Sequence, residues 1–228
     1  MKRSIFVTGT DTGVGKSLVA CALIEKFKAQ GLRVAGMKPV ASGGVMTVDG
    51  LRNEDALALR AVSNVDADYD IVNPYCFEPA TAPHLAAAEA GVNIDFNRLT
   101  SCHAELLSNA DVVVVEGAGG WRVPLAEGFL SDFPESLQME VVLVVGLRLG
   151  CLNHAVLTAT SIEQGRCCPL LGWVGNVIDP LFPRLDGNLG TLKQRLNPPC
   201  LGLIPHLDEK HIASIADLLD ISALNPRQ

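Results

Sequence analysis

A glycine-rich segment near the amino terminus constrains this chain more than any other feature. Residues 6–17 read FVTGTDTGVGKS, and a stretch of periodic apolar residues follows at once. We predict a short buried strand at Ser4 to Val7, a turn at Gly9 to Gly15 and a helix at Lys16 to Gln30. A strand, a glycine-rich turn and a helix in this order form a phosphate-binding loop, so we expect the chain to bind a nucleoside triphosphate.

The loop and the helix after it supply the groups that hold phosphate. Backbone N–H groups of Gly9 to Gly15 and the positive end of the helix, roughly half an elementary charge, converge on the anion. Lys16 would reach the β- and γ-phosphates, and the Ser17 hydroxyl would ligate Mg²⁺.

The spacing of the glycines differs from the common loop, so we weighed two alternatives. Gly9 and Gly15 enclose five residues where the usual pattern has four, which predicts a variant loop. A dinucleotide-binding fold is disfavoured, because Leu18 stands at the third glycine position and the second strand ends in Lys38 rather than in an acid. A glycine turn that only joins a strand to a helix would not explain the Lys-Ser pair at the helix start.

Composition sets the scale of the fold and argues against several kinds of partner. The 228 residues, 48% of them hydrophobic, fit one α/β domain over 1–228. A net charge of -7 without a cluster of Lys and Arg argues against a nucleic-acid surface. Met1 to Arg3 lead directly into the first strand and no apolar run could span a bilayer, so we expect a cytosolic protein. Seven scattered cysteines without zinc-site spacing are expected to be reduced thiols.

Short apolar runs alternate with helical patterns along the chain. The runs are Ile5 to Thr8, Val34 to Met37, Val112 to Val115, Val141 to Val145, Leu171 to Val174 and Leu201 to Leu203. This alternation predicts a single-domain α/β fold of the P-loop NTPase type, with a mostly parallel sheet and helices on both faces. Ligands bind such a sheet at the carboxyl ends of its strands.

Two segments outside this pattern are also informative. Val40 to Asn53 is the longest stretch that we expect to be irregular, and long loops in compact domains are more often functional than filler. Asn73 to His84 contains three prolines and is expected to form an extended wall near the site. The histidines show no metal or triad spacing, and we expect His103 to lie at the surface.

Three charged residues stand where chemistry is expected. Glu116 ends a run of four valines before Gly117, which favours Mg²⁺ ligation over a helix-cap or ion-pair role. Asp55 lies in the first turn of a predicted helix, where an acid ordinarily only complements the helix dipole. Lys38 ends the second strand, where it would either neutralise a transferring phosphoryl group or be a solvated surface lysine.

Taken together, the motifs GTDTGVGKS, GMKPVASG, GLRNEDALAL, VVVEGAGGW, GCLNHAVLT and GWVGN resemble those of the dethiobiotin synthetase family. The resemblance runs from Phe6 to Leu207. It implies a cyclo-ligase that forms C–N bonds, making a cyclic urea from 7,8-diaminononanoate, CO₂ and ATP with Mg²⁺ in the penultimate step of biotin synthesis. The family passes through a carbamate and a carbamic-phosphoric anhydride. No protein nucleophile is needed, so catalysis is positioning plus charge neutralisation by Lys16 and Lys38.

The resemblance also implies a ligand for each part of the site. Thr12 and Ser42 would bind the carbamate and diamine end, and Mg²⁺ would lie on Ser17, Asp55 and Glu116. The residues implied at the nucleotide are Gly13, Val14, Gly15, Lys16, Ser17, Leu18, Asp55, Glu116, Gly117, Ala118, Gly119, Asn176, Val177, Pro205, His206 and Leu207.

A further implication is a homodimer whose site spans both subunits. In the family the substrate carboxylate meets the start of a helix of the neighbouring subunit, here Gly150, Cys151, Leu152 and Asn153. A helix N-terminus attracts an anion, and Cys151 would be contact surface rather than a catalytic thiol.

The chain departs from the family pattern at several positions. Gly13 and Ser17 replace residues that are often Glu and Thr, and both changes are chemically mild. Asn188 stands where some members place a tyrosine over the substrate tail. Ile212 stands where an acid would contact adenine, and Glu209 is the nearest acid.

Two rival readings remain. A dimerising ATPase of the partitioning type usually carries an extra lysine early in the loop, and Gly9 to Gly15 contain none. A paralogue that acts on another amine or carboxylate is disfavoured by the intact GMKPVASG motif, while Asn188 keeps this possibility open.

Overall fold

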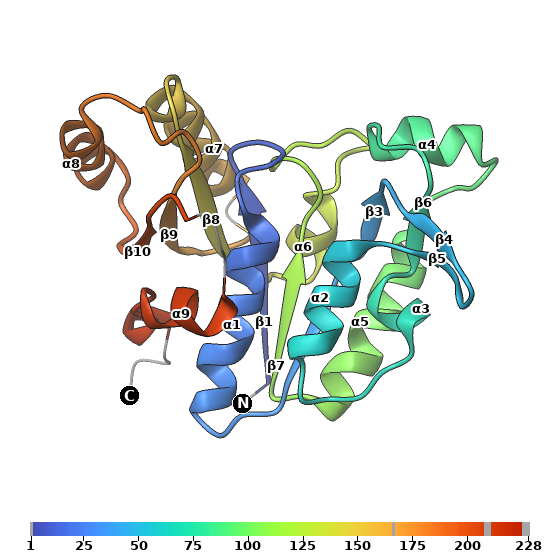
Figure 1. The fold of residues 1–228 in the computed structure, drawn as a ribbon. Coiled ribbons are helices and arrows are strands. Elements are labelled where there is room, and N and C mark those ends of the chain that lie inside the picture. The colour runs from blue at the N-terminus through green and yellow to red at the C-terminus, as the bar shows by residue number, and fades with distance from the viewer. Residues whose placement is uncertain (1, 166, 208–210, 225–228) are drawn as a thin grey trace.

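A parallel sheet of six strands forms the centre of the described structure (Figure 1). The structure is a computed structural model that describes residues 2–165, 167–207 and 211–224. The strands are β1 (Arg3–Gly9), β2 (Val34–Met37), β7 (Val112–Glu116), β8 (Glu140–Leu147), β9 (Leu170–Val177) and β10 (Cys200–Ile204). Their order is β10-β9-β8-β1-β7-β2, and every neighbouring pair is parallel. Each predicted apolar run lies in one of these strands, so the predicted sheet is confirmed.

Both faces of the sheet are covered, which explains why its strands lack polar alternation. Successive side chains of a strand point to opposite faces. In β7, Val113 and Val115 pack with Phe6 in one core cluster, whereas Val112 and Val114 pack with α1 (Lys16–Ala29) in the other. Every residue of β7 is buried.

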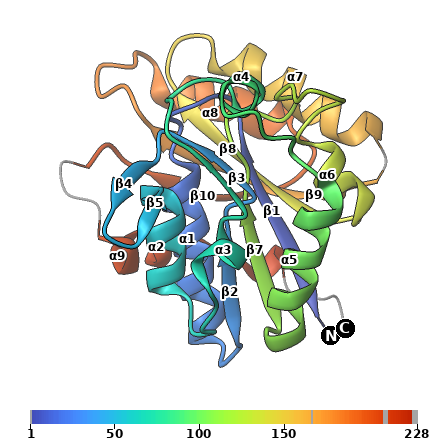
Figure 2. The ribbon, with the colours of Figure 1, turned by 90° about the vertical axis from the view of Figure 1, so that its right-hand side faces the viewer.

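Helices form the outer layers, as Figures 1 and 2 show. On one face lie α1, α2 (Glu54–Val62) and α9 (Ile212–Asp217), and on the other lie α5 (Phe96–Asn109), α6 (Asp132–Ser136), α7 (Cys151–Gly165) and α8 (Leu185–Arg195). The short helices α3 (Tyr69–Val72) and α4 (Pro83–Glu89) and a 3₁₀ turn at Ser222–Leu224 complete the described helices. None of the described helices is long and apolar enough to cross a membrane.

The expectation of an irregular segment from Val40 to Asn53 is wrong. Three short strands lie in it: β3 (Val40–Ser42), β4 (Val45–Thr47) and β5 (Gly50–Arg52). β3 pairs in parallel with β6 (Tyr75–Phe77), and β4 and β5 form an antiparallel hairpin. Gly50 has a φ of 101°, a left-handed conformation that favours glycine at this turn. The segment is therefore an ordered structure that extends from the end of β2.

The expectation that His103 lies at the surface is also wrong. His103 is on the inner face of α5 and is 5% exposed. Its Nε2 lies 2.8 Å from Ser4 Oγ, and its ring meets the Phe133 ring edge-on. Burial lowers the pKa of His103 to about 4, so the imidazole is neutral in the folded protein.

Candidate active site

The phosphate-binding loop joins β1 to α1 at the carboxyl edge of the sheet, which is at the top of Figure 1. Gly13 and Gly15 have φ values of 73° and 95°. A Cβ at Gly15 would also overlap the Asn176 side-chain amide, so this position requires glycine. Asn176 Nδ2 donates a hydrogen bond to Val14 O at 2.9 Å and thereby ties the loop to the end of β9.

Lys16 begins α1 and is almost completely buried. Its side chain is 6% exposed, and Nζ donates to the main-chain oxygen of Asp11 at 3.0 Å. Burial, and then the positive charge of Lys38, lowers the pKa of Lys16 to about 8. The Asp11 carboxylate pairs with Arg148, which follows β8. Sequence reasoning missed this ion pair, since no motif links residues so far apart in the chain.

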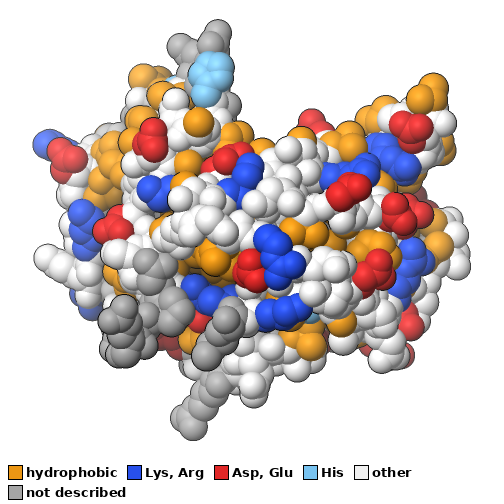
Figure 3. Space-filling model, turned by 90° about the horizontal axis from the view of Figure 1, so that it is seen from below, with side chains coloured by type: hydrophobic (Ala, Val, Ile, Leu, Met, Phe, Trp, Pro, Cys, Tyr) orange, Lys and Arg blue, Asp and Glu red, His pale blue; other side chains and the backbone are white. Residues whose placement is uncertain are grey.

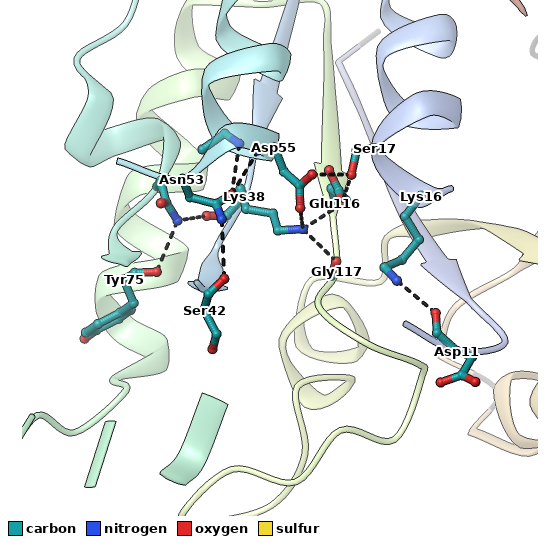
Figure 4. Close-up of polar contacts among 12 residues, drawn as sticks. Asp11, Lys16, Ser17, Lys38, Ser42, Asn53, Asp55, Tyr75, Glu116 and Gly117 are labelled. Carbon is teal, nitrogen blue, oxygen red and sulfur yellow. Dashed lines mark hydrogen bonds and ion pairs between the residues drawn. The ribbon is translucent and has the colours of Figure 1, made fainter. Parts of the chain in front are cut away.

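Lys38 lies between two carboxylates from two other elements (Figure 4). Its Nζ donates to Asp55 Oδ2 at 2.9 Å and to Glu116 Oε1 at 2.6 Å, and it lies 3.3 Å from Gly117 O. Lys38 is 4% exposed and Glu116 1% exposed. Lys38 is therefore no solvated surface lysine, because it is buried and paired with both predicted acids.

Ser17 completes this group of side chains. Its Oγ lies 2.6 Å from Asp55 Oδ1 and 2.8 Å from Glu116 Oε1. Asn53 positions Asp55 by capping α2, since its Oδ1 accepts from the N–H groups of Asp55 and Ala56 at 3.1 and 3.3 Å. The strand end, the helix cap and the loop thus bring residues from three distant parts of the chain to one point.

In this group, burial and the neighbouring charges shift the pKa values in opposite directions. Desolvation acts to lower the pKa of Lys38, but the charges of Glu116 and Asp55 outweigh it and raise that pKa. Desolvation likewise acts to raise the pKa of Asp55, and the charge of Lys38 with hydrogen bonds from Lys38 and Ser17 lowers it overall. Lys38 is therefore a cation and Asp55 an anion at neutral pH.

The oxygen atoms of this group fit a magnesium ion. Ser17, Asp55 and Glu116 present hydroxyl and carboxylate oxygens, and the buried Glu116 Oε2 has no hydrogen-bond partner among the described residues. Within the described ranges, no three His, Cys, Asp or Glu side chains gather as a metal cage. Mg²⁺ does not need such a cage, since one or two carboxylates, substrate phosphates and water satisfy it.

A cavity of about 800 Å³ opens beside these side chains. Predicted site residues that line it are Thr12, Gly13, Gly15, Lys16, Ser17, Lys38, Ser42, Asp55, Glu116, Ala118 and Gly119. Ser42 Oγ is buried and has no hydrogen-bond partner among the described residues, so it remains available to a ligand.

Several lining residues were not assigned as site residues from the sequence. They are Ala41, Glu54, Ala80, Thr81, Ala82, Pro83, Gly120, Val123 and Pro124. The prolines of Asn73 to His84 had predicted a wall near the site, and Ala80 to Pro83 form part of it. Val123 and Pro124 carry no comparable signal, because they are ordinary apolar residues beyond the GAGG turn.

The remaining predicted residues lie outside this cavity. They are Val14, Leu18, Gly117, Gly150, Cys151, Leu152, Asn153, Asn176, Val177, Pro205, His206 and Leu207. His206 Nδ1 lies 3.4 Å from Val177 O, which brings two of the adenine-side segments together. Glu209 is outside the described residues.

The start of α7 differs in one respect from what the resemblance implies. The Cys151 side chain is 2% exposed and packs in a core cluster, and its N–H donates to Arg148 O at 3.0 Å. Cys151 therefore offers neither a thiol nor a free N–H to a ligand. Asn188, on α8, donates its side-chain amide to O of Arg184, the residue that caps the start of α8, at 2.9 Å.

Comparisons with known proteins give the fold class first and then the family. A family model described as an AAA domain matches residues 3–211. The ParA family ATPase of Chlorobium tepidum TLS matches 99% of both chains with a TM-score of 0.59 and 15% identity. The MinD cell division protein of Aquifex aeolicus matches 95% of this chain and 94% of its own, with a TM-score of 0.57 and 17% identity. At such identities these structures show the fold alone, and with the glycine-rich loop they define a P-loop nucleotide-binding protein.

Relatives of higher identity give the family. The ATP-dependent dethiobiotin synthetase BioD of Pseudomonas aeruginosa (strain UCBPP-PA14) is 51% identical over 97% of both chains. That of Xanthomonas euvesicatoria pv. vesicatoria (strain 85-10) is 50% identical over 89% of this chain and 90% of its own. This chain belongs to the ATP-dependent dethiobiotin synthetase family, which confirms the resemblance and disfavours the partitioning ATPases.

Proposed function

We propose that this protein is a dethiobiotin synthase, a ligase that closes the ureido ring of dethiobiotin from 7,8-diaminononanoate and CO₂ with hydrolysis of ATP to ADP and phosphate. The observation that carries this proposal is the buried Lys38, held between Asp55 and Glu116 on one side of a cavity whose other side carries Lys16 and the phosphate-binding loop. Such an arrangement suits a reaction in which negative charge builds between a carboxyl group and a phosphoryl group.

The proposed reaction has three steps. One amine of the substrate adds to CO₂ and loses a proton, which leaves a carbamate. A carbamate oxygen attacks the γ-phosphorus of ATP, and the bond from that phosphorus to the ADP oxygen breaks. The second amine then attacks the carbonyl carbon, loses a proton, and expels phosphate as the ring closes. Each step needs reactants held in line rather than a protein nucleophile.

The residues of the chain bind and orient these charges. The Lys16 ammonium would contact the β- and γ-phosphates, and Lys38 would neutralise the carbamate and the transferring phosphoryl group. Thr12 and the unpartnered Ser42 hydroxyl line the cavity where the diamine end would bind. A magnesium ion on Ser17, Asp55 and Glu116 would supply further charge neutralisation at the phosphates.

The nucleotide base is proposed to lie against Asn176, Val177 and the segment from Pro205 to Leu207, which already contact each other through His206 and Val177. One of the two Asn176 side-chain N–H groups donates to Val14 O, so Asn176 would offer adenine its Oδ1 and the other N–H. Loop backbone from Gly13 to Leu18 would hold the phosphates, and Gly117 to Gly119 would lie beside them.

The substrate carboxylate is proposed to bind a second copy of the chain, at the start of its α7. Gly150 to Asn153 do not line the cavity of the same chain. Leu149, Val156 and Leu157 are apolar and 84%, 37% and 60% exposed, as suits a surface covered by a partner. Because the Cys151 N–H is already used, the N–H groups of Leu152 and Asn153 would bind the carboxylate.

The cytosol is proposed as the compartment. All seven cysteines are unpaired, and Cys167 is exposed beside Cys168. Unpaired thiols are typical of a reducing compartment. Detection of the protein only in a membrane or exported fraction would contradict this proposal.

The activity can be tested directly with the purified protein. Phosphate release from Mg-ATP is followed with and without 7,8-diaminononanoate and bicarbonate, while labelled bicarbonate is traced into acid-stable product. The proposal predicts release and label that require both co-substrates. Release without either, or none at all, would favour an ATPase switch or a paralogue with another substrate.

The shared site has a test of its own. A Lys16→Ala chain and an Asn153→Asp chain are each expected to be inactive as homodimers, because one has lost its phosphate contact and the other repels the carboxylate. Mixed heterodimers would regain activity at the one site that combines two intact halves. No recovery, with subunit exchange verified by mass, would indicate that each site is contained in one chain.

A further inference from the structure

The two tyrosines of the chain make an unusually well matched pair. Tyr69 and Tyr75 are each 6% exposed, and each hydroxyl accepts a hydrogen bond from a backbone N–H, of Asn53 at 2.7 Å and of Asp95 at 2.9 Å. An arginine covers each ring, Arg52 at 4.1 Å and Arg98 at 5.0 Å. The two tyrosines differ in the further contacts of their hydroxyl groups.

The Tyr69 hydroxyl continues toward the candidate site. It donates to Asn73 Oδ1 at 2.9 Å, and Asn73 Nδ2 donates to the main-chain oxygen of Lys38 at 2.6 Å. The backbone N–H of Lys38 in turn donates to Val72 O at 2.8 Å. Both backbone polar groups of Lys38 are therefore held by the segment from Tyr69 to Asn73.

A second hydrogen bond of the Tyr69 hydroxyl links it to the start of α2, which carries Asp55. The hydroxyl accepts a hydrogen bond from the Asn53 N–H. The Asn53 side chain in turn caps α2 by accepting from the N–H groups of Asp55 and Ala56. The Asn53 side-chain nitrogen also lies 3.4 Å from Ser42 O, a contact drawn in Figure 4. One buried hydroxyl thus connects the backbones that carry Lys38, Asp55 and Ser42.

We propose that Asn53, Tyr69 and Asn73 form a positioning network that fixes the backbone of Lys38 relative to the first turn of α2, and so sets the distance between Lys38 Nζ and Asp55 during catalysis. The inference deepens the proposed function and rests on it for the role of Lys38. None of the three residues lines the cavity, so they act through the residues that do.

The composition of the network suits this role. Asn53 and Asn73 are 4% and 3% exposed, and a buried, fully bonded polar network stiffens the segments that it joins. Burial raises the pKa of Tyr69 to about 12, so its hydroxyl keeps the proton that it donates to Asn73. A misplacement of about 1 Å in a catalytic group can cost about a hundredfold in rate, so a loosened network would reduce turnover.

The test compares Tyr69→Phe with Tyr75→Phe. Tyr69→Phe leaves the buried Asn53 N–H without its acceptor and Asn73 Oδ1 without its donor, whereas Tyr75→Phe affects only the part-buried Asp95 N–H. The melting temperature should therefore fall further in Tyr69→Phe, and kcat is compared at a temperature where both variants are fully folded. We expect Tyr69→Phe to lower kcat about tenfold with little change in KM for the diamine, and Tyr75→Phe to stay within about twofold of the parent. Equal losses of kcat in both variants, or an unchanged kcat in Tyr69→Phe, would overturn the proposal.

Hydrogen exchange gives a readout that does not depend on turnover. In the ligand-free protein, the Asp55 and Ala56 amides should exchange at least about tenfold faster in Tyr69→Phe than in Tyr75→Phe, because the Asn53 cap is loosened. Unchanged exchange at these amides would contradict the network. If the parent protein forms no dethiobiotin, the proposed function fails, while this measurement still decides whether Tyr69 holds α2.

Asn73→Ala provides a second variant in case one substitution prevents folding. It removes the bond to Lys38 O and should lower kcat at least as much as Tyr69→Phe. The double variant should lose little more than the worse single variant, because both substitutions break the same connection. Fully additive losses would show that Tyr69 and Asn73 act independently and would contradict a single network.

Discussion

The two ends of the parallel sheet differ in whether the polar side chains beside their cavities find hydrogen-bond or ion-pair partners among the described residues. At the amino end, seen from below in Figure 3, a cavity of about 1120 Å³ is bordered by Arg3, Ser4, His103 and Glu140. These four pair among themselves, Arg3 with Glu140 at 2.6 Å and Ser4 with His103 at 2.8 Å. At the carboxyl end the cavity is smaller, about 800 Å³, but two buried polar oxygens beside it, Glu116 Oε2 and Ser42 Oγ, have no partner among the described residues.

This difference teaches that the chemistry, rather than the size, of a cavity identifies the site. Keeping Lys16, Lys38 and Glu116 buried costs several kcal/mol per ion before pairing, and a buried ion pair is weak evidence of a stabilising role, so this burial points to a use of the charges by a ligand. The larger cavity has no comparable cost, since its charged pair is only partly buried. Variants at the two ends can therefore be matched against each other.

The largest effect is expected from removing the cation at the carboxyl end. Lys38→Ala should lower kcat by roughly a hundredfold or more, because a charge partner of the transition state is lost. Arg3→Ala, which removes the cation of the Arg3–Glu140 pair at the amino end, should leave kcat within about twofold. Steady-state kinetics of both variants measures the contrast, and near-normal turnover by Lys38→Ala would remove Lys38 from the mechanism.

The matched acids give the next contrast. Glu116→Gln should raise the Mg²⁺ concentration for half-maximal activity by at least about tenfold, because even outer-shell partners of a metal typically contribute that much. Glu140→Gln, at the start of β8, carries the same change at the other end of the sheet and should not shift the Mg²⁺ titration. An identical titration for the parent and Glu116→Gln would exclude Glu116 as a metal ligand.

A smaller effect follows from the lowered pKa of Lys16. The ligand-free protein holds this lysine charged below pH 8 and loses the charge above it, since its pKa is about 8. We therefore expect kcat/KM for ATP to fall about fourfold at pH 8.5 relative to the plateau at pH 7. kcat itself should stay flat, because bound phosphates favour the charged form. A pH profile of kcat/KM with no inflection between pH 7 and 9 would contradict this, and Lys16→Met should lack the inflection.

The sheet was predictable from sequence because its strands are buried on both faces. Runs such as VVVV in β7 have no polar alternation, so their position was evident without any knowledge of their partners. The pairing of β3 with β6 was not predictable in this way. Each has only three residues, and the contact joins segments more than thirty residues apart, so only the tertiary fold brings them together.

In the site, too, some residues were predictable from the sequence and others were not. Glu116 was predicted because it ends a buried strand beside glycines. Asp55 and Lys38 were assigned only through the family resemblance, because an acid in a first helical turn and a lysine at a strand end both have ordinary alternative roles. The Tyr69 hydroxyl carries no such signal, because a lone tyrosine in a polar stretch has no periodicity or motif. The burial of His103 did have a signal that was overlooked, since Leu99, Cys102, His103 and Leu106 follow the spacing of one helix face.

The smallest effect on catalysis is expected from His103, and it concerns acid stability instead. The folded-state pKa of about 4 lies below the ordinary value of 6.5, so the unfolded chain binds the extra proton first as pH falls. Stability is fully present above pH 6.5 and is lost down to about pH 4, by up to about 3 kcal/mol at roughly 1.4 kcal/mol per unit. His103→Gln should flatten this part of the curve of unfolding free energy against pH and leave kcat unchanged.

The control for His103→Gln is His154→Gln, which changes an exposed histidine of α7. It should retain the acid slope of the parent, because His154 is exposed and the buried His103 is left in place. Urea unfolding at several pH values between 4 and 7 measures both curves. If His103→Gln kept the slope, the acid sensitivity would come from other groups. If His103→Gln lowered kcat, the two ends of the sheet would be coupled. The contrast between an amino end whose polar groups pair with one another and a carboxyl end that binds ligands would then be wrong.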